Sequence, residues 1–69
     1  MDAARVLSPR ERQVVSLLAA GLNGSEIASR LRISPATVRT HVEHAKMKLE
    51  ARTRGQAIAI AVRRGLLDD

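Results

Sequence analysis

One short segment carries the side chains best suited to recognise another molecule. Apolar residues at positions 38, 42, 45 and 49 predict a helix that is buried along one stripe, and its opposite face then presents Arg39, Thr40 and Glu43. An arginine can donate two hydrogen bonds to guanine, a threonine can touch a thymine methyl or a base edge, and a glutamate can accept from the amino group of cytosine. These three residues are therefore candidate base contacts in the major groove of DNA.

The acidic member of this face has two possible roles. A carboxylate is repelled by a phosphate backbone, so Glu43 would either discriminate between bases or orient Arg39, four residues earlier, through an ion pair on the same helix. Ordinary solvated helix surfaces carry the same residue types. These residue types alone therefore do not indicate DNA binding. The position of this helix in the chain is the further observation that favours it.

Composition favours a polyanionic partner and disfavours catalysis. The 69 residues include 12 Lys and Arg against 7 Asp and Glu, a formal net charge of +5. Without cysteine there is no disulfide or thiolate zinc site, and His41 and His44 lack a third ligand on their face. No nucleophile with a base and no glycine-rich phosphate loop is present. We expect no enzyme activity, no metal and no cofactor.

The same composition bears on location. No apolar run approaches the roughly 20 residues needed to span a membrane, and the first seven residues do not form a signal-peptide core. The prediction is a cytoplasmic chain with no membrane partner.

Capping signals divide the chain into four helices, which predicts an all-α domain. A serine, asparagine or threonine precedes each helix, and glycine follows the first and the last. The expected helices cover 9–20, 24–31, 35–49 and a segment between Thr53 and Gly65. Leu66 and Leu67 should fold back onto the core and leave Asp68 and Asp69 in solvent.

The second and third predicted helices are joined by residues 32–34 alone. Three residues are too few to connect antiparallel helices packed side by side, and this spacing is typical of a helix-turn-helix. Free amides at helix N-termini can bind phosphates, and a basic run at Lys46, Lys48, Arg52 and Arg54 could add contacts. The candidate backbone contacts are Asn23, Gly24, Ser25, Ser34, Thr37 and Lys46.

The fourth predicted helix has more apolar surface than a small bundle can bury. Residues 57–62 are all apolar, whereas an outer helix needs only a stripe. If Ala57, Ile58 and Ala61 face the core, the residues pointing away are Ala59, Ile60 and Arg63. A two-fold contact there would pair two recognition helices. A fully internal helix, or a face that docks a missing domain, would explain the same pattern.

Several segments resemble the LuxR/GerE/NarL-type DNA-binding domain. They are Leu7-Ser8-Pro9-Arg10-Glu11-Arg12, Ala20-Gly21-Leu22, Glu26-Ile27-Ala28, Leu31 with Ile33-Ser34, residues 37–42, Lys48-Leu49 and residues 57–67. The resemblance covers about residues 6–67. Since a chain of 69 residues can hold one domain, residues 1–69 are predicted to form a single domain with its core at about 6–67. It implies a four-helix helix-turn-helix bundle without a wing, base contacts from the third helix, backbone contacts from Thr37 and Lys46, and dimerisation through the fourth helix.

Two residues depart from the pattern of that family. Glu50 stands where the family usually has glycine, so either a positive φ there costs about 1 kcal/mol or the turn into the fourth helix differs. Glu43 stands where the family commonly has a basic or small polar residue. The target sequence therefore cannot be transferred from relatives.

The leading hypothesis is a transcription regulator that binds double-stranded DNA sequence-specifically as a homodimer, with no small-molecule ligand in this domain. One alternative is a module similar to sigma-factor region 4, which would also touch RNA polymerase. Another is a protein-interaction module whose fourth helix is the functional face. A membrane-surface peptide is disfavoured because the basic residues are spread over all four helices.

Overall fold

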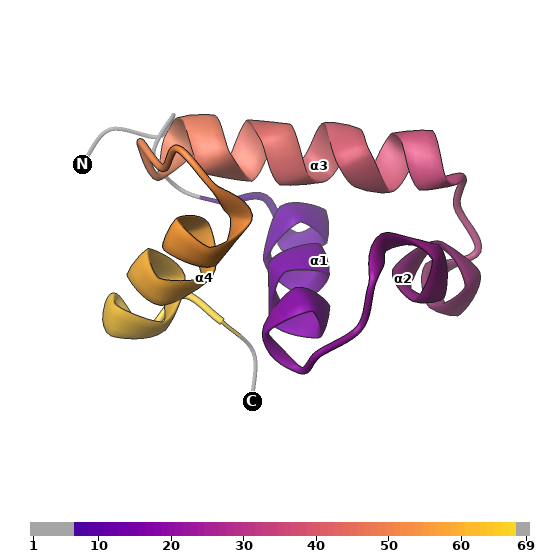
Figure 1. Cartoon of the computed structure of the whole chain (residues 1–69), viewed down its shortest axis with the longest axis horizontal. Helices are drawn as coiled ribbons and strands as arrows, with labels where there is room; N and C mark the ends of the chain where they lie inside the picture. The colour runs from indigo at the N-terminus through magenta and orange to yellow at the C-terminus, as the bar shows by residue number, and fades with distance from the viewer. Residues whose placement is uncertain (1–6, 68–69) are drawn as a thin grey trace.

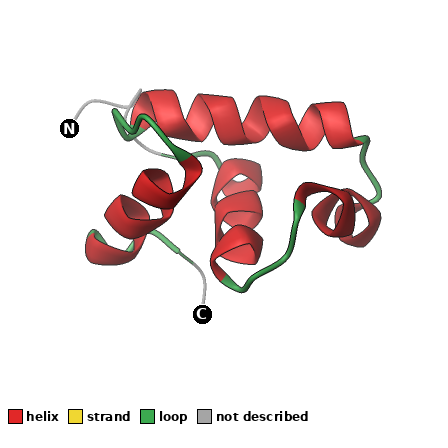
Figure 2. Cartoon of the chain, viewed as in Figure 1, coloured by secondary structure: helices red, strands yellow, loops and turns green. Residues whose placement is uncertain are grey.

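Four helices make up the structure, a computed structural model that describes residues 7–67. They are α1 (Pro9–Ala19), α2 (Gly24–Leu31), α3 (Pro35–Lys48) and α4 (Arg54–Arg63), joined by loops with no strand in that range (Figures 1 and 2). The all-α prediction is confirmed, and the predicted starts of α1, α2 and α3 agree with the structure. Val6, at the start of the predicted core, and Asp68 and Asp69, expected in solvent, lie outside the described residues.

Each helix begins at a side chain that accepts a hydrogen bond from the third helical amide. The capping residues are Ser8, Asn23, Ser34 and Thr53. At α1 and α2 the bond is reciprocal, because Glu11 and Glu26 accept from the amides of Ser8 and Asn23 at 2.8 and 2.9 Å. These local bonds satisfy amides that have no partner inside the helix, and so they fix where each helix starts.

All four helices also end in the same way, with one residue in the left-handed region. The next amide then donates to the carbonyl five residues earlier, at 2.8–3.1 Å, the arrangement of a Schellman motif. The four left-handed residues are Gly21, Arg32, Glu50 and Gly65, with φ of 99°, 58°, 56° and 67°. Two of these endings therefore use a residue with a Cβ, which strains the backbone.

The longest helix, α3, runs along one side of the molecule (Figure 1). Helix α1 packs beneath it and separates α2, near the start of α3, from α4, near its end. Helices α1 and α3 thus form the centre of the domain, and α2 and α4 flank them. Among residues 7–67, no helix covers the opposite side of α3.

The core has two halves. One unites α1 with α4 and the end of α3, and its buried members are Leu7, Val15, Ala45, Leu49, Ala57 and Ala61. The other unites α1 with α2 and the start of α3, and its buried members are Val14, Ile27, Ala28, Val38 and Val42. The predicted stripe on α3 is confirmed, and the consecutive valines of α1 serve different halves. Leu66 and Leu67 pack against the first half, as expected.

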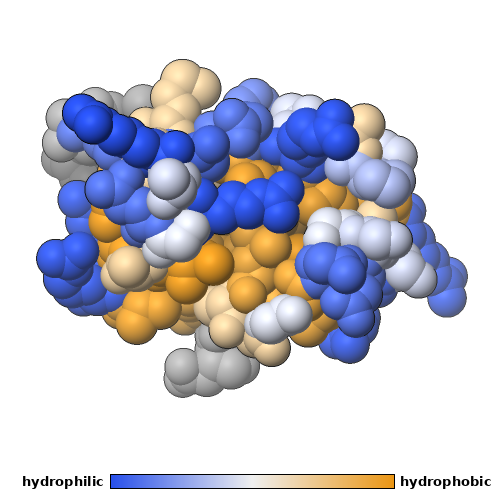
Figure 3. Space-filling view, viewed as in Figure 1, coloured by the Kyte–Doolittle hydropathy of each residue, from blue (hydrophilic) through white to orange (hydrophobic). Residues whose placement is uncertain are grey.

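The surface around this core is mixed. Apolar residues gather from the middle to the lower left of the face shown in Figure 3, and hydrophilic side chains predominate along its top and right. The most exposed large apolar residues in the described range are Met47 on α3, at 70%, and Val62 on α4, at 59%. Both lie on helices that the sequence analysis assigned to recognition or assembly.

Replacing Glu50 tests the strain at the end of α3. We expect Glu50→Gly to raise the free energy of unfolding by about 1 kcal/mol relative to Glu50→Ala, because only glycine relieves the positive φ while both substitutions remove the carboxylate. Urea denaturation of the two variants measures the difference. Equal stabilities would show that the left-handed conformation at this position carries no strain.

Candidate nucleic-acid interface

The three predicted base contacts lie together on the open side of α3. Arg39, Thr40 and Glu43 are all exposed, and they are on the side of the helix away from Val38 and Val42, which are buried. Spacings of three and four residues place them side by side along the helix. Their placement agrees with the helical periodicity in the sequence.

The polar contacts of this face bear on one of the two roles considered for Glu43, the orientation of Arg39. Glu43 pairs with Lys46 and not with Arg39. The Lys46 Nζ lies 3.2 Å from the Glu43 Oε2. Within residues 7–67, the Arg39 guanidinium makes no hydrogen bond or ion pair with another side chain. Arg39 is therefore available as a donor, and orienting it is not the role of Glu43 in this structure.

Five of the six predicted phosphate contacts are at helix starts, and the sixth, Lys46, is in the last turn of α3. Asn23 and Ser34 use their side-chain oxygens as caps, and Thr37 Oγ1 lies 2.9 Å from Ser34 Oγ. Ser25 is exposed, and a Cβ added to Gly24 would meet no atom within 4 Å. The fold itself therefore does not require glycine at position 24, and its backbone is open to approach from outside.

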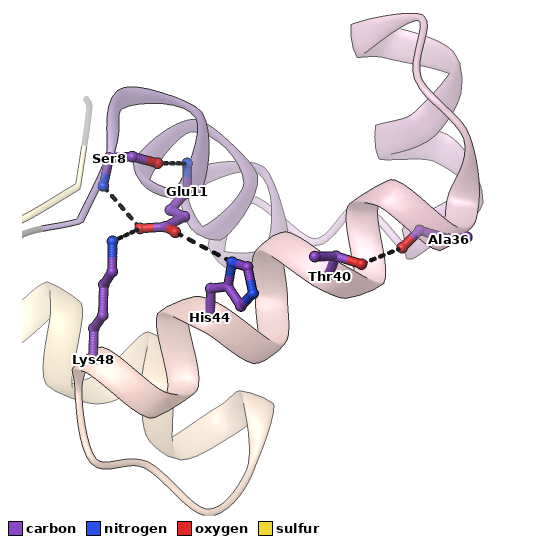
Figure 4. A network of polar contacts seen from close by, with 6 residues as sticks. All are labelled: Ser8, Glu11, Ala36, Thr40, His44 and Lys48. Atoms are coloured by element: carbon purple, nitrogen blue, oxygen red, sulfur yellow. Dashed lines mark hydrogen bonds and ion pairs between the residues drawn. The ribbon is translucent and has the colours of Figure 1, made fainter. Parts of the chain in front are cut away.

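A buried carboxylate positions α3 on α1. Glu11, only 4% exposed, accepts hydrogen bonds at Oε1 from the Ser8 amide and from Lys48 Nζ, both at 2.8 Å (Figure 4). His44 Nδ1 lies 3.9 Å from its Oε2. Two residues one turn apart on α3 thus converge on the first turn of α1.

This network changes the expectation for two residues. Lys48 is expected in a basic run facing phosphate, whereas its ammonium is committed to Glu11. His44, considered as a metal ligand, faces the same carboxylate, and His41 is half-buried. Among residues 7–67, no three His, Cys, Asp or Glu side chains are grouped to hold a metal. The contact between Glu11 and Lys48 could not be predicted from the sequence, because it joins residues 37 positions apart.

Burial alone would raise the pKa of the Glu11 carboxyl. Hydrogen bonds from Lys48 and from the Ser8 amide, together with the positive charge of Lys48, outweigh this effect and bring the pKa below its usual value. The charged form is therefore the one that the fold stabilises.

The outer face of α4 is composed differently from the prediction. Ala59 and Arg63 are exposed as expected, but Ile60 is half-buried and packs against the core. Val62, which was not predicted, is exposed and lies between Ala59 and Arg63 on the same face. Helix α4 packs against both α1 and α3, so more of its circumference is buried than a single stripe would require.

Helices α2 and α3, joined by a short turn and with polar side chains on the open side of α3, define a helix-turn-helix domain. The family model for bacterial regulatory proteins of the luxR family matches residues 5–61. An HTH-type transcriptional regulator of Mycobacterium bovis is 48% identical over 59 residues, which are 86% of this chain and 7% of that protein. The transcriptional regulatory protein NarL of Mycobacterium tuberculosis is 45% identical over 65 residues, 94% of this chain and 30% of NarL.

The structure of the transcription factor GerE superimposes with a TM-score of 0.85 at 37% identity, covering 90% of this chain and 92% of GerE. The chain belongs to the LuxR family of bacterial regulatory proteins. It spans less than a third of the length of the M. bovis regulator and of NarL.

The prediction of a domain without enzyme activity is confirmed, since these relatives are transcription regulators. None of the described helices is long and apolar enough to cross a membrane.

The pKa of Glu11 predicts how stability responds to acid. Because the folded chain keeps this carboxylate ionised to lower pH than the unfolded chain does, the unfolded chain takes up the proton first, and stability falls as pH drops below about 4.5. Glu11→Gln should lower the free energy of unfolding at pH 7 by about 1–3 kcal/mol and reduce the further loss between pH 5 and pH 3. Denaturant titrations across this range measure both effects.

The matched control is Glu26→Gln, which makes the same substitution at the same position of the α2 capping box, where the carboxylate is exposed. We expect a change of no more than about 0.5 kcal/mol there. If the two variants showed the same stability and the same acid response, the buried ion pair of Glu11 would not be stabilising the fold.

Proposed function

We propose that this domain binds double-stranded DNA sequence-specifically and regulates transcription, with α3 in the major groove. The observation that supports this most strongly is the exposed face of Arg39, Thr40 and Glu43 on the second helix of a helix-turn-helix. Membership of a family of regulatory proteins agrees with it. The proposed setting is the cytoplasm, and RNA polymerase is a further expected partner of such a regulator.

Phosphate contacts would hold α3 in register with the bases. A net charge of +5 attracts the domain to DNA, and the helix starts at Asn23, Gly24 and Ser25 and at Ser34 and Thr37 offer amides and hydroxyls. Lys46 adds a charged donor beside the base-facing residues. These contacts position the domain but do not read sequence.

Selection from a pool of randomised duplex DNA, at two salt concentrations, tests this function. We expect one enriched motif, and we expect Arg39→Ala to weaken binding to it by about 1–3 kcal/mol and to relax the preference at one guanine. Arg10→Ala is the control, since it removes the same charge from an exposed position on α1. Binding that persists at low salt with no enriched sequence would contradict sequence-specific recognition.

We further propose that two copies pair through α4. The exposed residues Ala59, Val62 and Arg63 form a face with a small and an apolar member, which would allow two helices to approach closely. Ile60, at the edge of the core, would border this contact. A two-fold axis there would present two α3 helices to half-sites about one DNA turn apart.

A charge on this face should abolish pairing. We expect Ala59→Glu to leave the thermal stability of the monomer unchanged, and to reduce binding to a two-half-site duplex to the level of a single half-site. Ala19→Glu, the same substitution at an exposed position of α1, should bind as the unmodified chain does. Analytical ultracentrifugation with each duplex gives the stoichiometry, and a 2:1 complex of Ala59→Glu would refute the interface.

The same variants test one of the two alternative functions, and binding to RNA polymerase tests the other. Loss of function from Ala59→Glu but not from Arg39→Ala would favour a protein-interaction module. A stable complex with RNA polymerase core in the absence of DNA would favour a module similar to sigma-factor region 4.

A further inference from the structure

The side chain of Glu43 is more exposed than that of its ion-pair partner, Lys46. Its side chain is 59% exposed, whereas that of Lys46 is 21% exposed. The stem of Lys46 therefore lies against the protein surface, and its ammonium holds one oxygen of Glu43 at 3.2 Å. The second oxygen, Oε1, accepts no hydrogen bond from the residues described here.

Thr40 also presents an acceptor. Its hydroxyl donates to the Ala36 carbonyl at 3.1 Å, within the same helix (Figure 4). With the proton engaged there, the oxygen faces solvent through its lone pairs. Thr40 and Glu43 are three residues apart, about 4.5 Å along the helix axis, so they are close enough to reach neighbouring base pairs, which are about 3.4 Å apart. The face thus combines one donor, Arg39, with two acceptors.

We propose that Glu43 makes this domain select a cytosine in each half-site, an inference that rests on the DNA binding proposed above. In the major groove guanine exposes two acceptors, and thymine exposes an acceptor and a methyl group. Adenine exposes an amino group beside an acceptor, whereas cytosine exposes its amino group without one. An ionised carboxylate can only accept hydrogen bonds, so cytosine is the base that it attracts and does not repel.

Thr40 acts in the same direction at the neighbouring base pair. While its proton is held by the Ala36 carbonyl, the Thr40 hydroxyl does not donate to guanine or to the carbonyl of thymine. It can accept from an amino group, or its methyl can touch that of thymine. Guanine should therefore be excluded at that position.

Lys46 makes a carboxylate tolerable in this place. Next to phosphates an isolated Glu43 would be repelled, but its ion pair with Lys46 has no net charge. The Lys46 ammonium also has further donors that can reach a phosphate. Lys46 is thus a positioning residue for Glu43 as well as a candidate backbone contact.

Selection from randomised duplexes with the unmodified chain, Glu43→Gln and Glu43→Ala tests the proposal. We expect the unmodified chain to prefer cytosine at one position by about fivefold to a hundredfold over the other bases. Glutamine, which pairs with the amino group and N7 of adenine, should move the preference at that position to adenine. Alanine should leave it without preference and should raise the affinity for unselected DNA.

Glu50→Gln is the matched control, because it removes the same charge just beyond the end of α3 at an exposed position outside the proposed contact. It should raise non-specific affinity and keep the cytosine. If Glu43→Gln and Glu43→Ala selected the same motif as the unmodified chain, the inference would fail while sequence-specific binding stood. If the unmodified chain selected no motif, both would fail.

Two variants of Lys46 test its positioning role. Lys46→Ala should reduce the preference for cytosine at least threefold as well as the overall affinity, since it frees the carboxylate. Lys46→Arg should restore both, because a guanidinium can still donate to Glu43. A uniform loss of affinity in Lys46→Ala with unchanged preference for cytosine would show that Lys46 contacts phosphate alone.

Discussion

The buried carboxylate of Glu11 is the interaction on which the geometry of the domain depends. Taking a carboxylate out of water is costly unless hydrogen bonds and an opposite charge compensate it. Ser8 supplies the bond from within α1, and Lys48 supplies the charge from the far end of α3. The Glu11 carboxylate therefore caps the N-terminus of α1 and also fixes the position of α3 on α1. Because Lys48 must face inward, Arg39, Thr40 and Glu43, which lie on a different side of α3, are held facing outward.

The absence of aromatic residues shapes the rest of the core. Without a large side chain to fill the centre, the structure uses two small groups of aliphatic residues on either side of α1. Alanines at the contacts of α4 let that helix lie close to its neighbours. Since Val14 and Val15 serve different halves, α1 links the part that holds the helix-turn-helix to the part that holds α4. The recognition helix and the proposed pairing helix thus share one support.

Much of this could be predicted from sequence, because the features that define helices act within four or five residues. The capping side chains, Gly21, Gly65 and the apolar stripe of α3 gave the elements and the exposed face. Four features could not be predicted. The ion pair of Glu11 with Lys48 joins distant residues, the burial of Ile60 depends on how α4 packs, and Arg32 gives no local indication of its positive φ. The choice of Glu43 between Arg39 and Lys46 was likewise decided by side-chain conformations, since both lie within reach.

The matching ends of the four helices have a consequence for the folding process. Each helix has a start that is specified by its own flanking residues, and glycine also specifies the ends of α1 and α4, so local interactions set much of the helical pattern. The remaining folding step is the docking of these short helices, which are separated by turns of a few residues. Such a chain closes only short loops at each step, which is the situation in which small helical proteins fold within microseconds to milliseconds. For a domain with so small a core, speed of folding limits the time during which its apolar residues are exposed to other chains.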